Sequence, residues 1–407
     1  MLKICETGLR HKNRPLLHTL SSSDPMDAGP KPMTEQKLTP REVNFDLTKL
    51  PTYKGRRQKT SFDGCTQVYQ VFIKSDGKIS CSCMRYYNIL EHADNVNVAE
   101  WYNGQVMEYI RESFEDGLEP FSFCSGCESR VADMDVRTAA KYVTLHIEPS
   151  SQCNLFCSAC TCTNERLSSN PPTRANLKFE TFKKVAYDFH GSEQVVGGFA
   201  FVGYGEPLFN SEVPKMVRLA RDLFPHSSIY LDTNCNFGPK RAIEIADCGF
   251  SEIRMALDGS NQEAYVQYRE SGNFKKAFAF ASVLANEVRK RKSSTKLVWK
   301  YILFRHNDSD EEILQAVDMA ESIGVEIQFD ATYGSLASPR SLNEIRALAG
   351  KRARTGTTVD PAAYDEDRPD IDLSGQALNY GRSKKGELLR KFRNAVPYLY
   401  AMLRPRA

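Results

Sequence analysis

The chain has 407 residues, of which 41% are hydrophobic, and its formal net charge is +3. This length suits one large domain or two ordinary ones with a substantial core, and the near-neutral charge gives no general case for nucleic-acid binding. No apolar run reaches the length of a transmembrane helix, which excludes a predicted membrane span.

Residues 1–55 are rich in Pro, Ser, Thr and charged side chains and lack periodicity, so we predict a flexible N-terminal tail. This region has no sustained apolar core of a signal peptide. We therefore expect a cytoplasmic chain whose thiols stay reduced. In that setting its 12 cysteines indicate metal or redox chemistry rather than disulfides.

Residues 60–132 form a Cys-rich segment. The stretch QVYQVFIKSDGKISCSC predicts two short strands around a Ser-Asp-Gly turn. The stretch NVAEWYNGQVMEYIRESFEDG that follows has the apolar spacing of a helix. The segment is therefore predicted to be a small α+β module, and its cysteines are Cys65, Cys81, Cys83, Cys124 and Cys127.

From residue 140 to 335 short apolar runs alternate with helical patterns. One helical pattern spans 309–324, where Ser309 and Glu312 fit a capping box and Gly324 fits a C-terminal stop. The alternation predicts an α/β fold of parallel βαβ units, with ligands at the carboxyl ends of the strands. The candidate strands are 142–149, 198–203, 228–233, 252–257, 296–304 and 325–330.

Periodicity fades after about residue 335, and we predict a linker and a basic helical tail over 336–407. The tail mixes basic and apolar residues, which is compatible with peripheral contact at a membrane or a partner. The alternative is a terminal helix packed on its own domain. Pro397, which interrupts the amphipathic face, favours that alternative.

Three cysteines, Cys153, Cys157 and Cys160, lie in the stretch CNLFCSAC directly after the first of these predicted strands. A closed zinc site needs four protein ligands, and iron–sulfur clusters are normally held by four cysteines. Three thiolates therefore indicate a metal centre with one position kept for a small molecule. The alternative is three buried structural cysteines.

The CxxxCxxC pattern after the first strand of a six-fold β/α repeat resembles the radical S-adenosylmethionine enzymes over residues 140–335. The resemblance implies a partial (β/α)6 TIM-like barrel. It also implies a 4Fe-4S cluster on these cysteines that binds S-adenosylmethionine through its open iron. Reductive cleavage of the cofactor would release a 5′-deoxyadenosyl radical, which abstracts hydrogen from a substrate.

Three further stretches resemble cofactor-binding motifs of that family. GYGEP, which is Gly203, Tyr204, Gly205, Glu206 and Pro207, is similar to the GGEP motif, so Glu206 would receive the methionyl amino group. In LDTNCN, Thr233 and Asn234 would face the cofactor. In the stretch ALDGSNQEAYVQYR, Asp258 would bond the ribose and Arg269 would pair with the methionyl carboxylate. Taken singly, these residues also suit turns or a surface ion pair.

The chain departs from the family pattern at two positions. Ala256 replaces the usual Ser, and Ala159 precedes the third cysteine where an aromatic residue is common. Cys162 is an additional thiol beyond a pattern that is already complete at Cys160.

The Cys-rich segment resembles the SPASM/twitch modules, which carry auxiliary 4Fe-4S clusters. On this resemblance the ligands would be Cys65, Cys124 and Cys127, with Cys81 or Cys83 as the fourth. A zinc ribbon of Cys81, Cys83, Cys124 and Cys127 is the alternative. The order is unusual, because in most relatives this module follows the barrel.

We therefore expect a radical S-adenosylmethionine enzyme with two 4Fe-4S clusters and a low-potential electron donor such as a flavodoxin or ferredoxin. The substrate is expected to be a carbohydrate or another small molecule that undergoes oxidation or modification. A peptide- or protein-modifying enzyme is one alternative, and a non-enzymatic metal-binding regulator or scaffold is another. No catalytic residue is assigned from the sequence.

Overall fold

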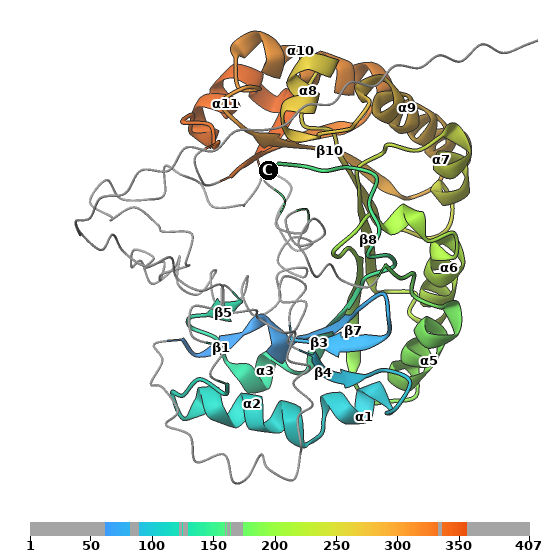
Figure 1. Cartoon of the computed structure of the whole chain (residues 1–407), viewed down its shortest axis with the longest axis vertical. Coiled ribbons are helices and arrows are strands. Elements are labelled where there is room, and N and C mark those ends of the chain that lie inside the picture. Colours follow the sequence, from blue (N-terminus) through green and yellow to red (C-terminus); the bar gives the residue numbers. More distant parts are fainter. Residues whose placement is uncertain are drawn as a thin grey trace, which may run out of the picture. The chain divides into compact units, whose positions relative to one another are not determined.

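The computed structural model describes residues 62–81, 89–121, 124, 129–158, 160, 163, 174–332 and 336–355 (Figure 1). These described residues all belong to one compact unit. The predicted flexible tail, the basic tail beyond residue 355, Cys83, Cys127, Ala159 and Cys162 lie outside the described residues.

A ten-stranded sheet runs through the described part of the chain in the order β12-β11-β10-β9-β8-β7-β6-β2-β3-β4. The six predicted barrel strands are confirmed, and each pairs in parallel with the next. They are β6 (Tyr142–Ile147), β7 (Val195–Phe201), β8 (Ser228–Thr233), β9 (Glu252–Ala256), β10 (Lys296–Leu303) and β11 (Glu326–Ala331).

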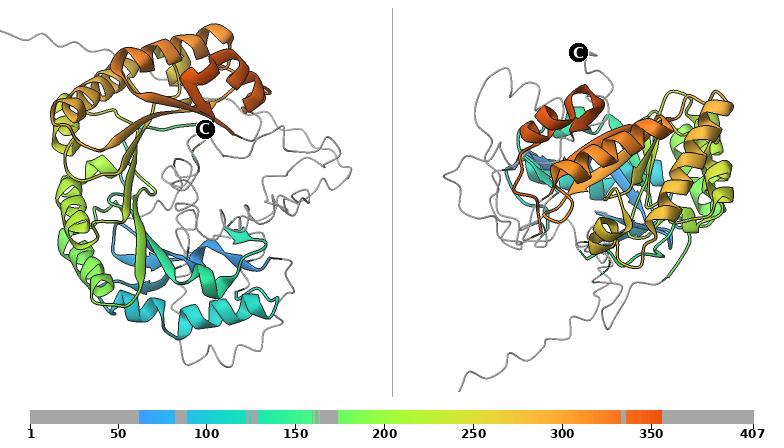
Figure 2. Two further views of the ribbon diagram at one scale, coloured as in Figure 1. Left: turned by 180° about the vertical axis from the view of Figure 1, so that it is seen from behind. Right: turned by 90° about the horizontal axis from the view of Figure 1, so that it is seen from above.

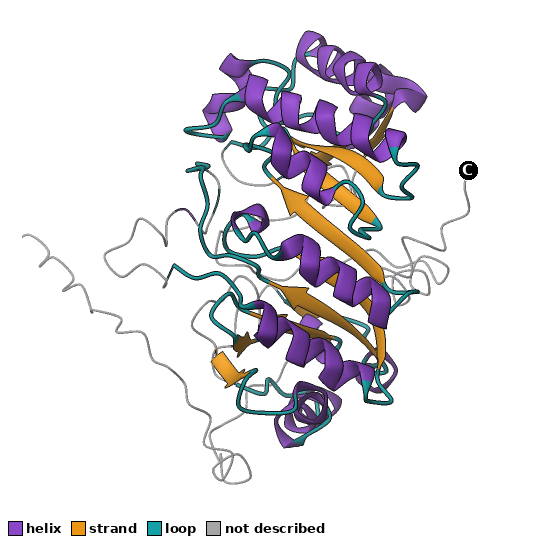
Figure 3. Cartoon of the chain, turned by 90° about the vertical axis from the view of Figure 1, so that its right-hand side faces the viewer, coloured by secondary structure: helices purple, strands orange, loops and turns teal. Residues whose placement is uncertain are grey.

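Helices lie along the outer side of the curved sheet, so helix and sheet form two layers (Figures 1 and 3). Alternate strand residues face this helical layer, as Phe199 and Phe201 of β7 do when they pack against Phe182. The barrel helices are α5 (Phe179–His190), α6 (Val213–Leu223), α7 (Pro239–Ile245), α8 (Gln262–Tyr268), α9 (Phe274–Lys290) and α10 (Asp310–Ile323). The predicted α/β class with a partial barrel is therefore confirmed.

The predicted hairpin forms, and it extends the barrel sheet. Strands β2 (Gln70–Ile73) and β3 (Lys78–Ser80) are antiparallel, and Gly77 takes a φ of 87° in the turn. Strand β4 (Ile89–His92) pairs with β3, while β2 pairs in parallel with β6. The division between a module and a barrel stays a prediction, but one sheet runs through both.

The single helix predicted in the Cys-rich segment is two helices, α1 (Val98–Tyr102) and α2 (Gln105–Glu115), separated at Gly104. Beside them (Figure 2) lie α3 (Val136–Ala139) and a two-stranded sheet of β1 (Gly64–Cys65) and β5 (Arg130–Val131). Short 3-10 turns occur at Thr66–Val68, Pro207–Phe209 and Gly350–Arg352.

The prediction of a linker from residue 336 is wrong at its start, because a helix and a strand form before residue 356. Helix α11 (Leu342–Ala349) begins with a capping box of Ser341 and Glu344, and β12 (Ala353–Thr355) adds a parallel strand beside β11. These elements are too short to show periodicity.

The predicted box at α10 forms only by half. Ser309 accepts from the Glu312 backbone, whereas the Glu312 carboxylate binds Ser260 and Asn261.

Within the described residues, no helix is long and apolar enough to cross a membrane.

Candidate cofactor site

The carboxyl ends of parallel strands meet at one edge of a sheet, where ligands bind in folds of this class. In this chain β6 leads into the cysteine loop, β7 into residues 203–207, β8 into residues 234–236 and β9 into Asp258. The predicted cofactor residues are therefore brought to one edge of the sheet.

The three cysteines lie in one small cluster. Cys157 is 5% exposed and packs with Leu155, Tyr268 and Phe304, and the half-buried Cys153 and Cys160 contact the same cluster. The loop is held by two backbone hydrogen bonds, Phe156 N to Glu270 O at 3.1 Å and Ser158 N to Tyr268 O at 3.1 Å. The last residue of α8 and the segment after it thus fix the path of the cysteine loop.

No three His, Cys, Asp or Glu side chains within the described residues are arranged to share one metal ion. A four-iron cluster makes a different demand, because each cysteine binds its own iron and the sulfurs stand further apart. A soft, three-thiol donor set gathered on one loop fits that cluster.

Two side chains donate to the cysteine sulfurs. Arg269 Nη1 lies 3.6 Å from Cys157 Sγ, and Asn234 Nδ2 lies 3.7 Å from Cys153 Sγ. Burial raises the pKa of the Cys157 thiol, and the Arg269 guanidinium opposes this shift. Donors of this kind orient metal ligands and tune the metal centre that they hold.

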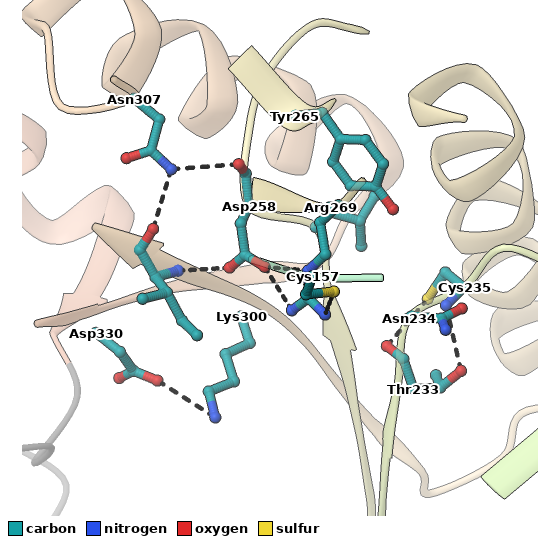
Figure 4. Close-up of polar contacts among 12 residues, drawn as sticks. Cys157, Thr233, Asn234, Cys235, Asp258, Tyr265, Arg269, Lys300, Asn307 and Asp330 are labelled. Atoms are coloured by element: carbon teal, nitrogen blue, oxygen red, sulfur yellow. Dashed lines mark hydrogen bonds and ion pairs between the residues drawn. The ribbon is translucent and has the colours of Figure 1, made fainter. Parts of the chain in front are cut away.

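Arg269 is itself held by Asp258 (Figure 4). Arg269 Nε lies 2.6 Å and Nη2 2.5 Å from Asp258 Oδ2, and Asp258 Oδ1 accepts from Ile302 N at 2.6 Å. Asp258 is fully buried. In this structure Asp258 therefore orients Arg269, a role that the sequence did not predict beside the expected contact to the ribose.

Glu206 is buried at the centre of the site. Its Oε1 accepts from Thr233 Oγ1 at 2.8 Å and Leu208 N at 3.1 Å, and its Oε2 accepts from Asn234 N at 2.7 Å. Burial nevertheless raises the pKa of Glu206 to about 7, against these hydrogen bonds. Since a carboxylate offers about four acceptor positions, one position on Oε2 is left for a further donor.

The glycines of the loop 203–207 allow it to approach the cysteine loop closely. A Cβ at Gly205 would lie 2.3 Å from Gln152 O, and Glu206 N donates to that same oxygen at 2.7 Å. The loop after β7 therefore packs closely against the residues that precede Cys153.

Polar side chains also occupy the face of the sheet that turns away from the helices. Arg254 Nε lies 2.9 Å from Asp232 Oδ1, and Lys300 Nζ lies 3.9 Å from Asp330 Oδ2 on the two strands beyond. Burial lowers the pKa of His146 to about 3, so this imidazole on β6 is neutral at physiological pH. Within the described residues its Nδ1 has no hydrogen-bond partner.

The second cysteine set is only partly described. Cys65 ends β1, Cys81 follows β3, and Cys124 is half-buried, while Cys83 and Cys127 lie outside the described residues. The described three do not by themselves form a metal-binding group. The auxiliary ligand set and its zinc-ribbon alternative both stay predictions.

The sequence reasoning missed two buried side chains at the site. Glu148 follows the first barrel strand directly, a position that marks it as an acid at the ligand-binding edge. Asn307 is fully buried and donates to Asp258 O at 3.2 Å and Ile302 O at 3.0 Å. No local pattern links Asn307 to the site, because Asp258 lies 49 residues away from it along the chain.

Comparison with known proteins agrees with the predicted resemblance. Residues 147–327 match the Radical SAM superfamily, which confirms that the barrel is a radical SAM domain. A GTP 3′,8-cyclase of Limosilactobacillus fermentum is 23% identical over 201 residues, 46% of this chain and 55% of that protein. The chain thus spans about half the length of this curated relative.

Two solved structures are also similar. A radical SAM methyltransferase from Sphaerobacter thermophilus has a TM-score of 0.41 at 15% identity, over 52% of this chain and 65% of that chain. Methylornithine synthase has a TM-score of 0.37 at 12% identity, over 65% of this chain and 83% of that chain.

Proposed function

We propose that this chain, whose residues 147–327 form a radical SAM domain, is an enzyme that reductively cleaves S-adenosylmethionine and abstracts hydrogen from a substrate. The contact between the cysteine loop and the GYGEP loop, closed by the 2.7 Å bond from Glu206 N to Gln152 O, carries the proposal. It supports the proposal because the loop proposed to bind the cluster and the carboxylate proposed to bind the methionyl amino group lie side by side.

The cluster on Cys153, Cys157 and Cys160 would supply the electron for cleavage, and the cofactor would supply the radical that takes hydrogen from the substrate. The chain's own residues bind and orient. Glu206 has one acceptor position left for the methionyl ammonium. Arg269 donates from Nε and Nη2 to Asp258 and from Nη1 to Cys157. A guanidinium has five N–H groups, so two are left for the methionyl carboxylate.

For the substrate we propose a polar small molecule, such as a carbohydrate, that lies against the polar face of the sheet. Asp232, Arg254, Lys300 and Asp330 provide charged groups of both signs there, and the neutral His146 provides a nitrogen without a partner among the described residues. An apolar substrate would desolvate these ion pairs and offer them no hydrogen bonds in place of water, at a cost in binding free energy. A low-potential flavodoxin or ferredoxin would supply the electron.

An auxiliary 4Fe-4S cluster on the second cysteine set would make the reaction an oxidation by accepting the substrate electron. We propose it from the sequence resemblance, with Cys65, Cys124 and Cys127 as ligands together with Cys81 or Cys83. The zinc ribbon is the competing outcome.

The proposed function is tested by anaerobic reconstitution of the full chain with iron and sulfide. Two clusters correspond to about eight irons per chain, and the variant with Cys153, Cys157 and Cys160 all changed to Ala should lose about half of that iron. It should also form no 5′-deoxyadenosine from S-adenosylmethionine and dithionite. Cys248→Ala, a buried cysteine outside the site, serves as the control and should behave as wild type. Cleavage that persists in the triple variant would refute the assignment.

A further inference from the structure

The first strand of the N-terminal hairpin ends beside the first barrel strand. Strand β2 pairs in parallel with β6 from Gln70↔Thr144 to Ile73↔Ile147, and Glu148 N donates to Ile73 O at 2.9 Å. The residues that follow each strand, Lys74 and Ser75 on one side and Glu148 on the other, therefore emerge together at the ligand-binding edge.

Glu148 is a buried carboxylate that joins three segments of the chain. It is 3% exposed, and Lys74 is 2% exposed. Its Oε1 accepts from Ser75 N at 3.2 Å and Ser75 Oγ at 2.9 Å. Its Oε2 accepts from Lys74 Nζ at 3.4 Å and from Tyr204 N at 2.9 Å.

The bond to Tyr204 connects this group to the cofactor loop. A Cβ at Gly203 would lie 2.5 Å from Glu148 Cγ, so the loop rests directly on the carboxylate side chain. Lys74 Nζ also lies 5.8 Å from the centroid of the Tyr204 ring, within the range of a cation–π contact. Glu206 follows two residues later, and its backbone is fixed to Gln152.

We propose that Lys74 and Ser75 of the N-terminal hairpin are positioning residues for S-adenosylmethionine, which act through Glu148 on the GYGEP loop. They hold the backbone of residues 203–206 so that the free acceptor position of Glu206 faces the methionyl amino group. This inference rests on the proposed function. It gives the N-terminal segment a part in cofactor binding that does not depend on an auxiliary cluster.

Charge pairing makes the arrangement sensitive to single changes. Removal of one partner from a buried ion pair leaves the other charge uncompensated, whereas removal of both is often tolerated. Lys74→Met would therefore leave the Glu148 carboxylate without its ammonium and displace the loop that rests on it. The double variant Lys74→Met/Glu148→Gln has no buried charge left over, and its glutamine oxygen can still accept from Tyr204 N.

The experiment measures S-adenosylmethionine binding to the anaerobically reconstituted full chain by isothermal titration calorimetry. Iron content and thermal unfolding are measured for every variant. We expect Lys74→Met and Glu148→Gln each to raise Kd about tenfold or more at unchanged iron content, and the double variant to fall nearer to wild type than either single variant. Ser75→Ala, the mildest change, should raise Kd about two- to threefold, since it removes one hydrogen bond.

A second readout separates positioning from general stability. The electron paramagnetic resonance signal of the reduced cluster should change on addition of S-adenosylmethionine in the wild type. At equal ligand concentration it should change less in Lys74→Met. Arg130→Met is the matched control, because Arg130 pairs with Glu119 at 2.7 Å in the same segment, with exposures of 13% and 6%. It should lower the unfolding temperature while Kd stays that of wild type.

The outcomes distinguish this inference from the function on which it rests. A wild-type chain that does not bind S-adenosylmethionine refutes the proposed function. If the wild type binds but the variants Lys74→Met, Glu148→Gln and Ser75→Ala bind equally well, the positioning role alone is wrong. Loss of binding in Arg130→Met equal to that in Lys74→Met would overturn it too, because the effect would then be general. Should Lys74→Met fail to fold, Glu148→Gln and Ser75→Ala decide the matter.

Discussion

The raised pKa of Glu206 predicts that S-adenosylmethionine binds more tightly as pH rises toward neutrality. Burial raises this pKa from 4.5 to about 7. Only the ionised carboxylate pairs with a methionyl ammonium. About a tenth of Glu206 is ionised at pH 6 and about half at pH 7, so affinity should increase about fivefold over this interval, or about 1 kcal/mol. Below pH 6 the change approaches about tenfold per pH unit.

Calorimetry in two buffers with different ionisation enthalpies measures the same linkage directly. Binding should release about 0.9 proton at pH 6 and about 0.5 at pH 7, because binding requires the ionised form. The range ends at pH 7, since the cofactor's own amino group loses its proton at about 7.7–8.0. Glu206→Gln should bind more weakly, by about 1.5–3 kcal/mol at pH 7, and should release no proton.

Glu119→Gln is the control, because that buried carboxylate is paired with Arg130 and belongs to another part of the chain. It should keep the pH dependence of the wild type. The reasoning fails if wild-type affinity is flat between pH 6 and 7. It also fails if Glu206→Gln shows the same slope.

The raised pKa of Glu206 also predicts that the chain without cofactor becomes less stable as pH rises, whereas its affinity for the cofactor increases. The folded pKa lies above the usual value, so the folded state binds the extra proton. The stabilisation is fully present below pH 4.5 and is lost as pH rises to about 7, by up to about 3 kcal/mol. Thermal unfolding at pH 5 and 7 should therefore differ less for Glu206→Gln than for the wild type.

Two further predictions concern the metal centres. Arg269→Gln removes a guanidinium that donates to Cys157, so the barrel cluster should have a lower reduction potential in a potentiometric titration, and an unchanged potential would contradict this role. Cys124→Ala should remove about half of the iron, retain cofactor cleavage and abolish substrate turnover if the second site is a cluster; a zinc ribbon instead predicts zinc in the wild type and loss of both activities on unfolding.

The barrel strands could be predicted because their signal is local. Each of the six is an apolar run flanked by turn residues, and the structure moves their boundaries by at most three residues, as at the start of β7. The three cysteines and the GYGEP stretch could be placed together for a related reason. Both follow parallel strands, and the carboxyl ends of such strands share one edge.

The contacts among the site residues could not be predicted, because they depend on strand register. Nothing in the spacing of Asp258 and Arg269 shows whether they bind a ligand or each other. Glu312 fits a capping box by sequence, yet its carboxylate binds the loop after β9, which lies 52 residues away from it along the chain. Tertiary partners of this kind compete with the local ones, and only the fold decides between them.

The position of the hairpin in the sheet explains how a segment that precedes the barrel can reach the proposed cofactor site. In the strand order, β2 adjoins β6, whose carboxyl end carries the cysteine loop, whereas β12 lies at the opposite edge. A segment added after the last strand would meet that far edge. The pairing of β2 with β6 is also parallel, so Lys74 and Ser75 emerge at the same edge as Glu148. An antiparallel neighbour would turn these residues to the other end of the sheet. Chain order and strand direction together bring this lysine within reach of the loop that is proposed to bind the cofactor.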